Sequence, residues 1–180
     1  MNRDNGLFMV IEGTDGSGKT TQYDLLRKKL SGAGHEVVEI HFPRYEEPSS
    51  YFVREYLSGS YGTADEVGPY TGSLFYALDR FQAAKIIREA LAEGKTVLCD
   101  RYVGSNMAHQ GTKFDHAEER RGYFLWLDNL EFSILGIPRP DLSFVLTNPY
   151  EVIKKRLSNK ADSSTHVKGK DIHEIDPSYS

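Results

Sequence analysis

Short apolar segments rich in β-branched residues recur along the chain, each bounded by turn-forming or charged residues. Stretches with apolar residues at helical spacing separate them. Strands that alternate with helices in this way are typical of βαβ units, in which the strands pair in parallel. The predicted strands are Leu7–Ile11, Val37–Phe42, Thr96–Cys99 and Leu142–Leu146.

The stretches between these strands repeat their apolar residues every three or four positions, which predicts amphipathic helices. In the longest, Tyr70–Ala92, the spacing of Leu74, Leu78 and Phe81 predicts a stripe that faces the core. The other predicted helices are Lys19–Leu30, Ala117–Leu135 and Glu151–Leu157.

This order of elements predicts an α/β fold of three layers, in which helices cover both faces of one parallel sheet. The length suits a single domain spanning residues 1–180. Such a sheet usually continues with one more strand and helix, which we expect this chain to lack after Ser180. The segment 158–170 is polar and has no apolar periodicity, so we expect a mobile lid there.

Composition argues against several classes of protein. The formal net charge of −4 argues against a broad nucleic-acid-binding surface. The first apolar run, Leu7–Ile11, is too short to span a membrane. The single cysteine, Cys99, lies within an apolar run and fits a reducing compartment rather than a disulfide framework. We therefore expect a cytoplasmic protein that binds neither nucleic acid nor membrane.

One motif carries specific chemistry. Residues Gly13–Thr20 match G-x-x-x-x-G-K-[ST] and lie between a predicted strand and a predicted helix. The glycines let backbone N–H groups turn around a phosphate, and the helix N-terminus adds partial positive charge. Lys19 is predicted to reach the β- and γ-phosphates of ATP, and the Thr20 hydroxyl to ligate Mg²⁺. The predicted ATP-binding residues are Gly13, Asp15, Gly16, Ser17, Gly18, Lys19, Thr20 and Thr21.

A second pair of charged residues, Asp100 and Arg101, directly follows the third predicted strand. In open parallel sheets ligands bind at the carboxyl ends of the strands, so both side chains are expected beside the phosphates. Asp100 is predicted to hold Mg²⁺, and Arg101 to contact phosphoryl oxygens as charge develops on them.

Four segments together resemble the thymidylate kinase family. They are Phe8–Gln22, Phe42–Arg44, Asp100–Gly111 and Arg139–Leu142, which occur in the family's order and extend over nearly the whole chain. The resemblance implies a P-loop kinase that transfers the γ-phosphate of ATP to dTMP with Mg²⁺. It also implies a homodimer.

The resemblance implies roles for individual residues. Asp15 would meet the deoxyribose 3′-hydroxyl, and Arg44 and Arg101 would contact the acceptor phosphate. Ser105 and Asn106 would lie near the base. The implied catalytic residues are Lys19, Arg101 and Asp15, and the implied substrate-binding residues are Asp15, Phe42, Arg44, Tyr76, Arg80, Arg101, Ser105, Asn106 and His109.

The helix at Tyr70–Ala92 offers two rings for the base. Members of the family stack an aromatic ring on thymine and place an arginine at a base carbonyl one helical turn later. Tyr76 and Arg80 are four residues apart and share a helix face, whereas Phe75 points elsewhere. We therefore predict that Tyr76 stacks on the base.

Several positions depart from the family pattern. Gly16 stands where some members carry an arginine, and in such cases a basic lid residue replaces it; Lys160, Lys168 and Lys170 are candidates. His109 stands where the family often has an aromatic ring beside the ribose 2′ position. Thr147-Asn148 replaces an acidic residue after the fourth strand.

Two other functions remain open at this point. A deoxynucleoside kinase would need a carboxylate base after the second strand, where this chain has Arg44 and only then Glu46 and Glu47. An arginine suits an acceptor phosphate better than a hydroxyl, which favours the monophosphate kinase. The other alternative is a nucleotide-binding protein that transfers no phosphate.

Overall fold

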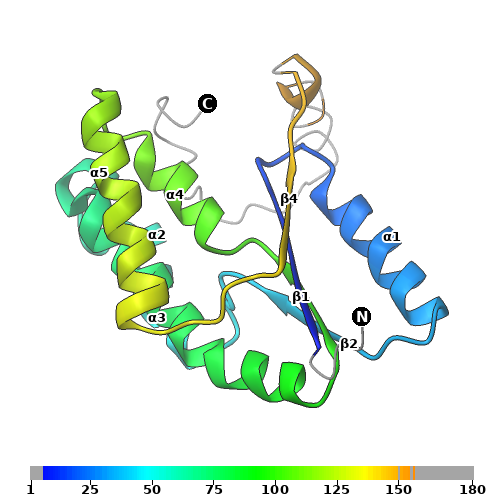
Figure 1. Cartoon of the computed structure of the whole chain (residues 1–180). Coiled ribbons are helices and arrows are strands. Elements are labelled where there is room, and N and C mark those ends of the chain that lie inside the picture. Colours follow the sequence, from blue (N-terminus) through cyan, green and yellow to red (C-terminus); the bar gives the residue numbers. More distant parts are fainter. Residues whose placement is uncertain (1–5, 150, 155, 157–180) are drawn as a thin grey trace. The chain divides into compact units, whose positions relative to one another are not determined.

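The strands of the structure form one parallel sheet. The computed structural model describes residues 6–149, 151–154 and 156. Within them, four strands pair in parallel in the order β2-β3-β1-β4 (Figure 1). The strands are β1 (Leu7–Gly13), β2 (Val37–His41), β3 (Thr96–Asp100) and β4 (Leu142–Leu146), which confirms the predicted positions and the α/β fold.

The described residues form two compact units. The sheet unit comprises those within Met1–His41, Ile87–Arg101 and Pro140–Lys168, and the helical unit those within Phe42–Ile86 and Tyr102–Arg139. The prediction of one domain stays a prediction. The predicted lid, 158–170, lies outside the described residues, as do its lysines Lys160, Lys168 and Lys170.

The sheet unit packs its core between β1, β3 and α1 (Lys19–Gly32). Met9, Ile11, Tyr23 and Leu98 form a buried cluster, and the Tyr23 hydroxyl donates to the Leu98 carbonyl at 3.0 Å. The continuous apolar sequence of β1 follows from its central place, because both faces of a parallel strand are covered. This packing fixes the end of β1 and the start of α1, which flank the phosphate-binding loop.

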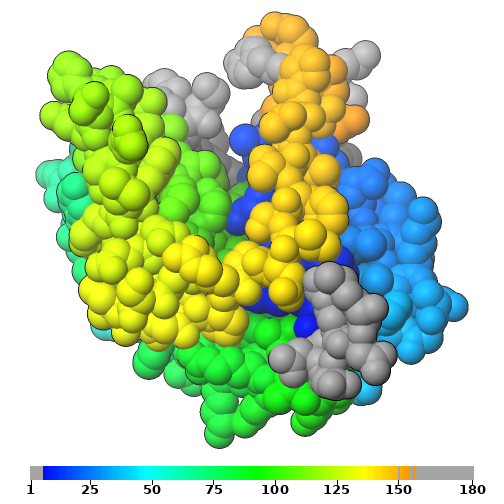
Figure 2. Space-filling model, in the orientation of Figure 1, coloured from blue at the N-terminus to red at the C-terminus, as the bar shows by residue number. Residues whose placement is uncertain are grey.

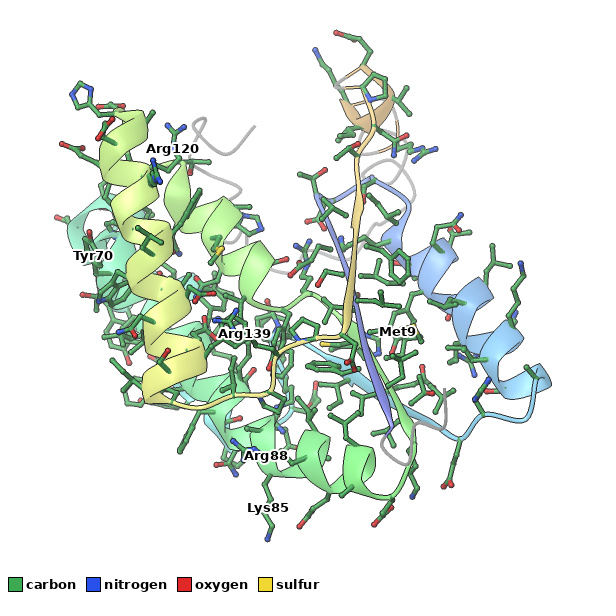
Figure 3. The ribbon with its side chains drawn as sticks, in the orientation of Figure 1. Met9, Tyr70, Lys85, Arg88, Arg120 and Arg139 are labelled. Atoms are coloured by element: carbon green, nitrogen blue, oxygen red, sulfur yellow. The ribbon has the colours of Figure 1, made fainter. Side chains whose placement is uncertain are left out.

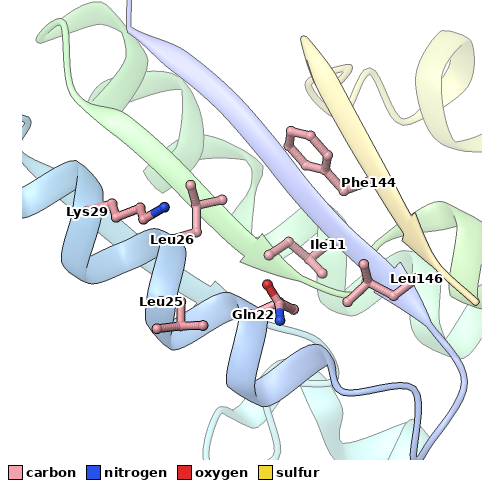
Figure 4. A pocket seen from close by; sticks show the side chains of 7 residues that line it. All are labelled: Ile11, Gln22, Leu25, Leu26, Lys29, Phe144 and Leu146. Carbon is pink, nitrogen blue, oxygen red and sulfur yellow. The ribbon is translucent and has the colours of Figure 1, made fainter.

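β4 lies at the edge of the described sheet, and its side chains are largely exposed (Figure 2). On the α1 side of β4 is a hollow of about 400 Å³. Its lining is mainly apolar and contains none of the predicted site residues (Figure 4). The lining residues are Ile11, Gln22, Leu25, Leu26, Lys29, Phe144 and Leu146.

The helical unit consists of helices that the chain adds after β2 and after β3 (Figure 1). The elements are the 3-10 turn η1 (Pro48–Ser50), α2 (Tyr51–Leu57), α3 (Ala64–Ala92), α4 (Val103–Gly111), α5 (Ala117–Asp128) and the π-helical turn η2 (Asn129–Ile134). α3 is kinked at Gly68, which adopts a φ of 73° just before Pro69, and its last residues belong to the sheet unit.

Aromatic rings join the elements of the helical unit. Tyr70 of α3, labelled in Figure 3, has its ring edge-on to that of Trp126 of α5; the two centroids are 4.7 Å apart. Tyr123 stacks near Phe114 at 5.0 Å, and its hydroxyl lies 2.8 Å from the Ser73 hydroxyl. Burial raises the pKa of the Tyr123 phenol.

The predicted helices are confirmed in position over the described residues, but the predicted core stripe of α3 is wrong. Leu74, Leu78 and Phe81 are 38%, 41% and 50% exposed. The inward face instead carries small residues such as Ala77 together with Arg80, which is only 2% exposed. Hydrophobicity selects the wrong face because the charge of Arg80 is compensated by a partner distant in the sequence.

No helix among the described residues is long and apolar enough to cross a membrane. Residues 151–154 and 156 are helical, in agreement with the predicted fourth helix, while residues 155 and 157 lie outside the description. The short helices α2 and α4 were not predicted.

The orientation of α3 can be tested through stability. Ala77 is fully buried, so Ala77→Leu should overpack the interior and lower the free energy of unfolding by about 1–3 kcal/mol. Gln82→Leu introduces the same side chain at an exposed position of α3 and should change it by less than about 0.5 kcal/mol. Urea unfolding of both variants measures the difference; equal losses would contradict this orientation.

Candidate active site

The phosphate-binding loop joins β1 to α1, and its shape requires glycine. Gly13 has a φ of 147°, and a Cβ there would lie 2.6 Å from the Leu146 carbonyl oxygen. Gly16 and Gly18 both adopt left-handed conformations, with φ of 76° and 97°. Gly18 directly precedes α1, so the loop leads into the N-terminus of that helix. These are the conditions for an anion-binding loop.

Lys19 begins α1 and is 8% exposed. Its Nζ donates to the Thr14 carbonyl at 3.4 Å and lies 3.7 Å from Asp15 Oδ1. Burial lowers the pKa of Lys19, and the positive charge of Arg101 lowers it further, while Asp15 acts in the opposite direction. The negative charge of a bound phosphate would stabilise the charged form of this partly desolvated ammonium group.

Arg101 is held beside the loop by its backbone and its side chain. It has a left-handed φ of 63°, uncommon for a residue with a Cβ, and its N–H donates to the Ile11 carbonyl at 2.9 Å. Its Nη2 donates to Asp15 Oδ1 at 2.6 Å. Lys19 and Arg101 therefore share one carboxylate, as expected for two cations that converge on the same anion site.

Asp100 supplies an oxygen suited to a metal ion. Its Oδ1 is buried and has no hydrogen-bond partner among the described residues, and its Oδ2 lies 3.7 Å from His41 Nδ1. The described part of the chain contains no group of three or more His, Cys, Asp or Glu side chains that would hold a metal by themselves. One carboxylate with an unpartnered oxygen fits Mg²⁺, which is usually bound through few protein ligands plus nucleotide phosphates.

Two further side chains hold the loop and were not predicted to do so. Asn148 Nδ2 donates to the Ser17 carbonyl at 2.7 Å, and Arg156 Nη1 donates to the Gly16 carbonyl at 3.0 Å. A trans peptide directs its C=O and the next N–H to opposite sides. The Asn148 bond therefore fixes the direction of the Gly18 N–H. The only sign of this role in the sequence is that Thr147-Asn148 departs from the family pattern.

Arg44 belongs to the helical unit and is tightly oriented there. Its Nε donates to Asp79 Oδ1 at 3.1 Å, its backbone N–H donates to Asp79 Oδ2 at 2.8 Å, and its Nη2 donates to Ser49 Oγ at 2.8 Å. Asp79 is 1% exposed. The sequence pattern did not identify Asp79 as the residue that holds this predicted phosphate ligand.

Arg80 and Asn106 meet at a buried carboxylate. Arg80 Nε and Nη2 each donate to one oxygen of Glu131 at 2.5 Å. Asn106 Nδ2 lies 3.3 Å from Glu131 Oε1 and 3.2 Å from the Ser73 carbonyl oxygen. Glu131 has 0% exposure and was not among the predicted residues.

Tyr76, which is predicted to stack on the base, and the neighbouring Phe75 occupy different surroundings. Phe75 lies in an aromatic cluster with Phe52, Tyr56 and Tyr61, at centroid distances of 5.4–5.8 Å. Tyr76 meets Tyr56 edge-on at 6.3 Å. That Tyr76 rather than Phe75 stacks on the base stays a prediction.

The predicted residues on α4 differ in their exposure. Ser105 is half-buried and His109 is exposed, whereas Gln110, one turn after Asn106, is fully buried. Both amide atoms of Gln110 lack a hydrogen-bond partner among the described residues. Buried polar atoms are normally paired, so this side chain, absent from the predicted set, is a candidate for ligand contact.

Phe42 begins the helical unit. It is 5% exposed, and its ring centroid lies 5.7 Å from that of Tyr102 and 6.0 Å from the Arg44 guanidinium. The sheet unit thus brings together Asp15, Lys19, Asp100 and Arg101. The helical unit brings Phe42 beside Arg44, and it brings Arg80 and Asn106 to the same carboxylate.

Comparison with known proteins identifies the family. A family model described as thymidylate kinase matches residues 11–175. The chain is 35% identical over 171 residues to a thymidylate kinase of Caulobacter vibrioides, covering 94% of this chain and 78% of that protein. It is 36% identical over 154 residues to a probable thymidylate kinase of Pyrococcus horikoshii, covering 84% and 70%.

A solved structure is also similar. The thymidylate kinase from Candida albicans superposes with a TM-score of 0.67 at 28% identity, covering 94% of this chain and 71% of that chain. The match to the family model extends from β1 beyond the described residues. This chain belongs to the thymidylate kinase family.

Proposed function

We propose that this chain transfers the γ-phosphate of ATP to dTMP, giving ADP and dTDP. The observation that carries the proposal is the convergence of Lys19 and Arg101 on Asp15 at the phosphate-binding loop of a thymidylate kinase family member. Phosphoryl transfer needs positioned phosphates and neutralised charge rather than covalent chemistry from the protein, and these residues supply both.

The sheet unit would hold the donor. Backbone N–H groups of Gly13–Thr21 surround the phosphates, and Lys19 approaches the β- and γ-phosphates. The Thr20 hydroxyl and Asp100 would hold Mg²⁺, which, when bound, would supply positive charge that offsets the negative charge of the phosphates. The unpartnered Asp100 Oδ1 supports this role.

The transfer itself would need no general base. An oxygen of the dTMP phosphate is already ionised near neutral pH; it forms the new bond to the γ-phosphorus as the bond to the ADP oxygen breaks. Arg101 would neutralise charge on the transferring group, and Arg44, oriented by Asp79, would hold the acceptor phosphate. Asp15 would orient Arg101 and accept from the deoxyribose 3′-hydroxyl.

The helical unit would read the base. Tyr76 would stack on thymine, with Phe42, Ser105 and His109 around the nucleotide. Arg80 and Asn106 would contact the base edge, and the two unpartnered amide atoms of Gln110 support a further contact there. The Candida albicans enzyme is described as having broad substrate specificity, so acceptor breadth is a property to measure in this chain.

A cation from the lid would complete the charge balance, since Gly16 supplies none. Lys160, Lys168 and Lys170 are the proposed sources, all beyond the described residues. Arg156 is a further source, because its guanidinium already contacts the loop carbonyl of Gly16. We propose that the enzyme acts in the cytoplasm.

The exposed stripe of α3 supports a homodimer. Leu74, Leu78 and Phe81 recur at helical spacing on the surface of the helical unit, with Tyr70, 45% exposed, one turn earlier. Contiguous exposed apolar side chains are typical of interaction surfaces. We propose that this stripe pairs with the same stripe of a second copy. No observation favours a deoxynucleoside kinase or a non-catalytic protein.

The activity is tested by measuring ADP formation with and without dTMP. We expect ADP formation to depend on dTMP and to fall by at least about 100-fold in Lys19→Ala, which removes charge from the transferring phosphates. Lys29→Ala removes a lysine from the last turn of the same helix and should be near normal. Circular dichroism verifies folding. ADP formation independent of dTMP, or normal turnover by a folded Lys19→Ala protein, would refute the proposal.

The role of Asn148 is tested through the donor alone. Asn148→Leu removes the hydrogen bond to Ser17, and we expect KM for ATP to rise about 5- to 10-fold, the scale of one hydrogen bond, with KM for dTMP unchanged. Thr147→Val alters the exposed neighbour and should leave both constants unchanged. An equal rise in both KM values would indicate a general loss of structure instead.

A further inference from the structure

Glu131 is fully buried in the helical unit and holds two of the proposed base-reading side chains at once. Its two carboxylate oxygens accept from Arg80 Nη2 and Nε at 2.5 Å, and Oε1 also lies 3.3 Å from Asn106 Nδ2. Arg80 and Asn106 are themselves 2% and 4% exposed. Glu131 lies in the π-helical turn η2, a distortion that occurs frequently at functional sites.

These contacts determine which end of the Asn106 amide faces the protein. Its nitrogen meets two oxygens, Glu131 Oε1 and the Ser73 carbonyl at 3.2 Å. Rotating the amide by half a turn would place Oδ1 against both of those acceptors and leave the two N–H groups on the other side. An ionised carboxylate has only acceptor oxygens, and both oxygens of Glu131 accept from Arg80. Glu131 therefore presents only an acceptor to Asn106.

The opposite end of the amide is then fixed as well. Asn106 Oδ1 is buried and has no hydrogen-bond partner among the described residues. An amide oxygen accepts hydrogen bonds and donates none. Leaving a buried acceptor unpaired is unfavourable, so a ligand that brings an N–H to this atom binds better than one that brings another acceptor.

We propose that Glu131 is a positioning residue that makes Asn106 an obligate acceptor and thereby selects bases that carry a ring N–H, thymine and uracil, over cytosine. Thymine and uracil carry a hydrogen on N3, whereas N3 of cytosine is an acceptor. This inference rests on the proposed function, which sets Asn106 at the base edge.

Gln110 is not oriented in the same way and therefore cannot discriminate between the bases. It lies one turn after Asn106 on α4, is fully buried, and has no hydrogen-bond partner for either amide atom among the described residues. Within the part of the chain that the structure describes, no hydrogen bond fixes its amide, so Gln110 can offer a donor or an acceptor to either base. Gln110 would add affinity, and discrimination at N3 would come from the amide that Glu131 orients.

The test measures kcat/KM for dTMP and for dCMP. The wild-type ratio should be about 100 or more, because the wrong base leaves buried polar groups unpaired. Glu131→Gln keeps the shape but can present a donor to Asn106, so we expect the ratio to fall at least about tenfold while KM for ATP is unchanged. Glu131→Asp is shorter but still acceptor-only, so it should retain more of the ratio than Glu131→Gln.

The order of these two variants separates positioning from packing. If Glu131 only fills space, the isosteric Glu131→Gln would be the milder change, and that order would overturn the inference. A folded Glu131→Gln with an unchanged ratio would also overturn it. Asp128→Asn is the matched control: it removes a carboxylate from the exposed Arg139–Asp128 pair one turn earlier and should leave the ratio unchanged.

Binding to the wild-type protein keeps the inference testable if Glu131→Gln does not fold. Uracil and cytosine have nearly the same size and differ in their hydrogen-bonding edge, so calorimetric titration with dUMP and dCMP isolates that edge. Tighter binding of dUMP by at least about tenfold in wild type, retained in Glu131→Asp, supports the inference, and equal affinities overturn it. Preferential dUMP binding without dTMP-dependent ADP formation would refute the proposed activity and leave this inference standing.

Discussion

The buried ion pair between Arg80 and Glu131 is the interaction on which the helical unit depends. A carboxylate with no solvent exposure is stable only if its charge and its hydrogen bonds are satisfied, and removing one partner of such a pair typically costs about 3–5 kcal/mol. Arg80 of α3 and Asn106 of α4 both meet Glu131 of η2, so three elements converge on one side chain. The same contacts that stabilise the unit orient the groups proposed to read a base.

This constraint accounts for the orientation of α3. Turning Arg80 inward requires the small residues of the same face, such as Ala77, to line the interior. It also turns Leu74, Leu78 and Phe81 outward, where their exposure supports a surface for a second copy. The sheet unit follows a different rule: backbone geometry shapes the phosphate-binding loop, and the side chains of Asn148 and Arg156 hold its carbonyls.

The parts of the structure that depend on local sequence could be predicted. Parallel strands buried on both faces are continuous apolar runs, and the loop requires glycines at fixed positions, so both were found from the sequence. Contacts between distant residues could not be predicted. The inward face of α3 depends on Glu131, 51 residues beyond Arg80, and the support of the loop depends on Asn148, 131 residues beyond Ser17. The helix α4, with few apolar residues, shows no periodicity strong enough to predict it.

The orientation of the Asn106 amide is the most direct test of this account. In protein labelled with nitrogen-15 at asparagine side chains, nuclear magnetic resonance locates the two Nδ2 protons relative to neighbouring protons. If Glu131 orients the amide, these protons exchange slowly with water, lie close to Ser73 and Arg80, and keep that position when dTMP is bound. Nδ2 protons that instead lie against the bound base would contradict it, because Asn106 would then be a donor that Glu131 does not orient.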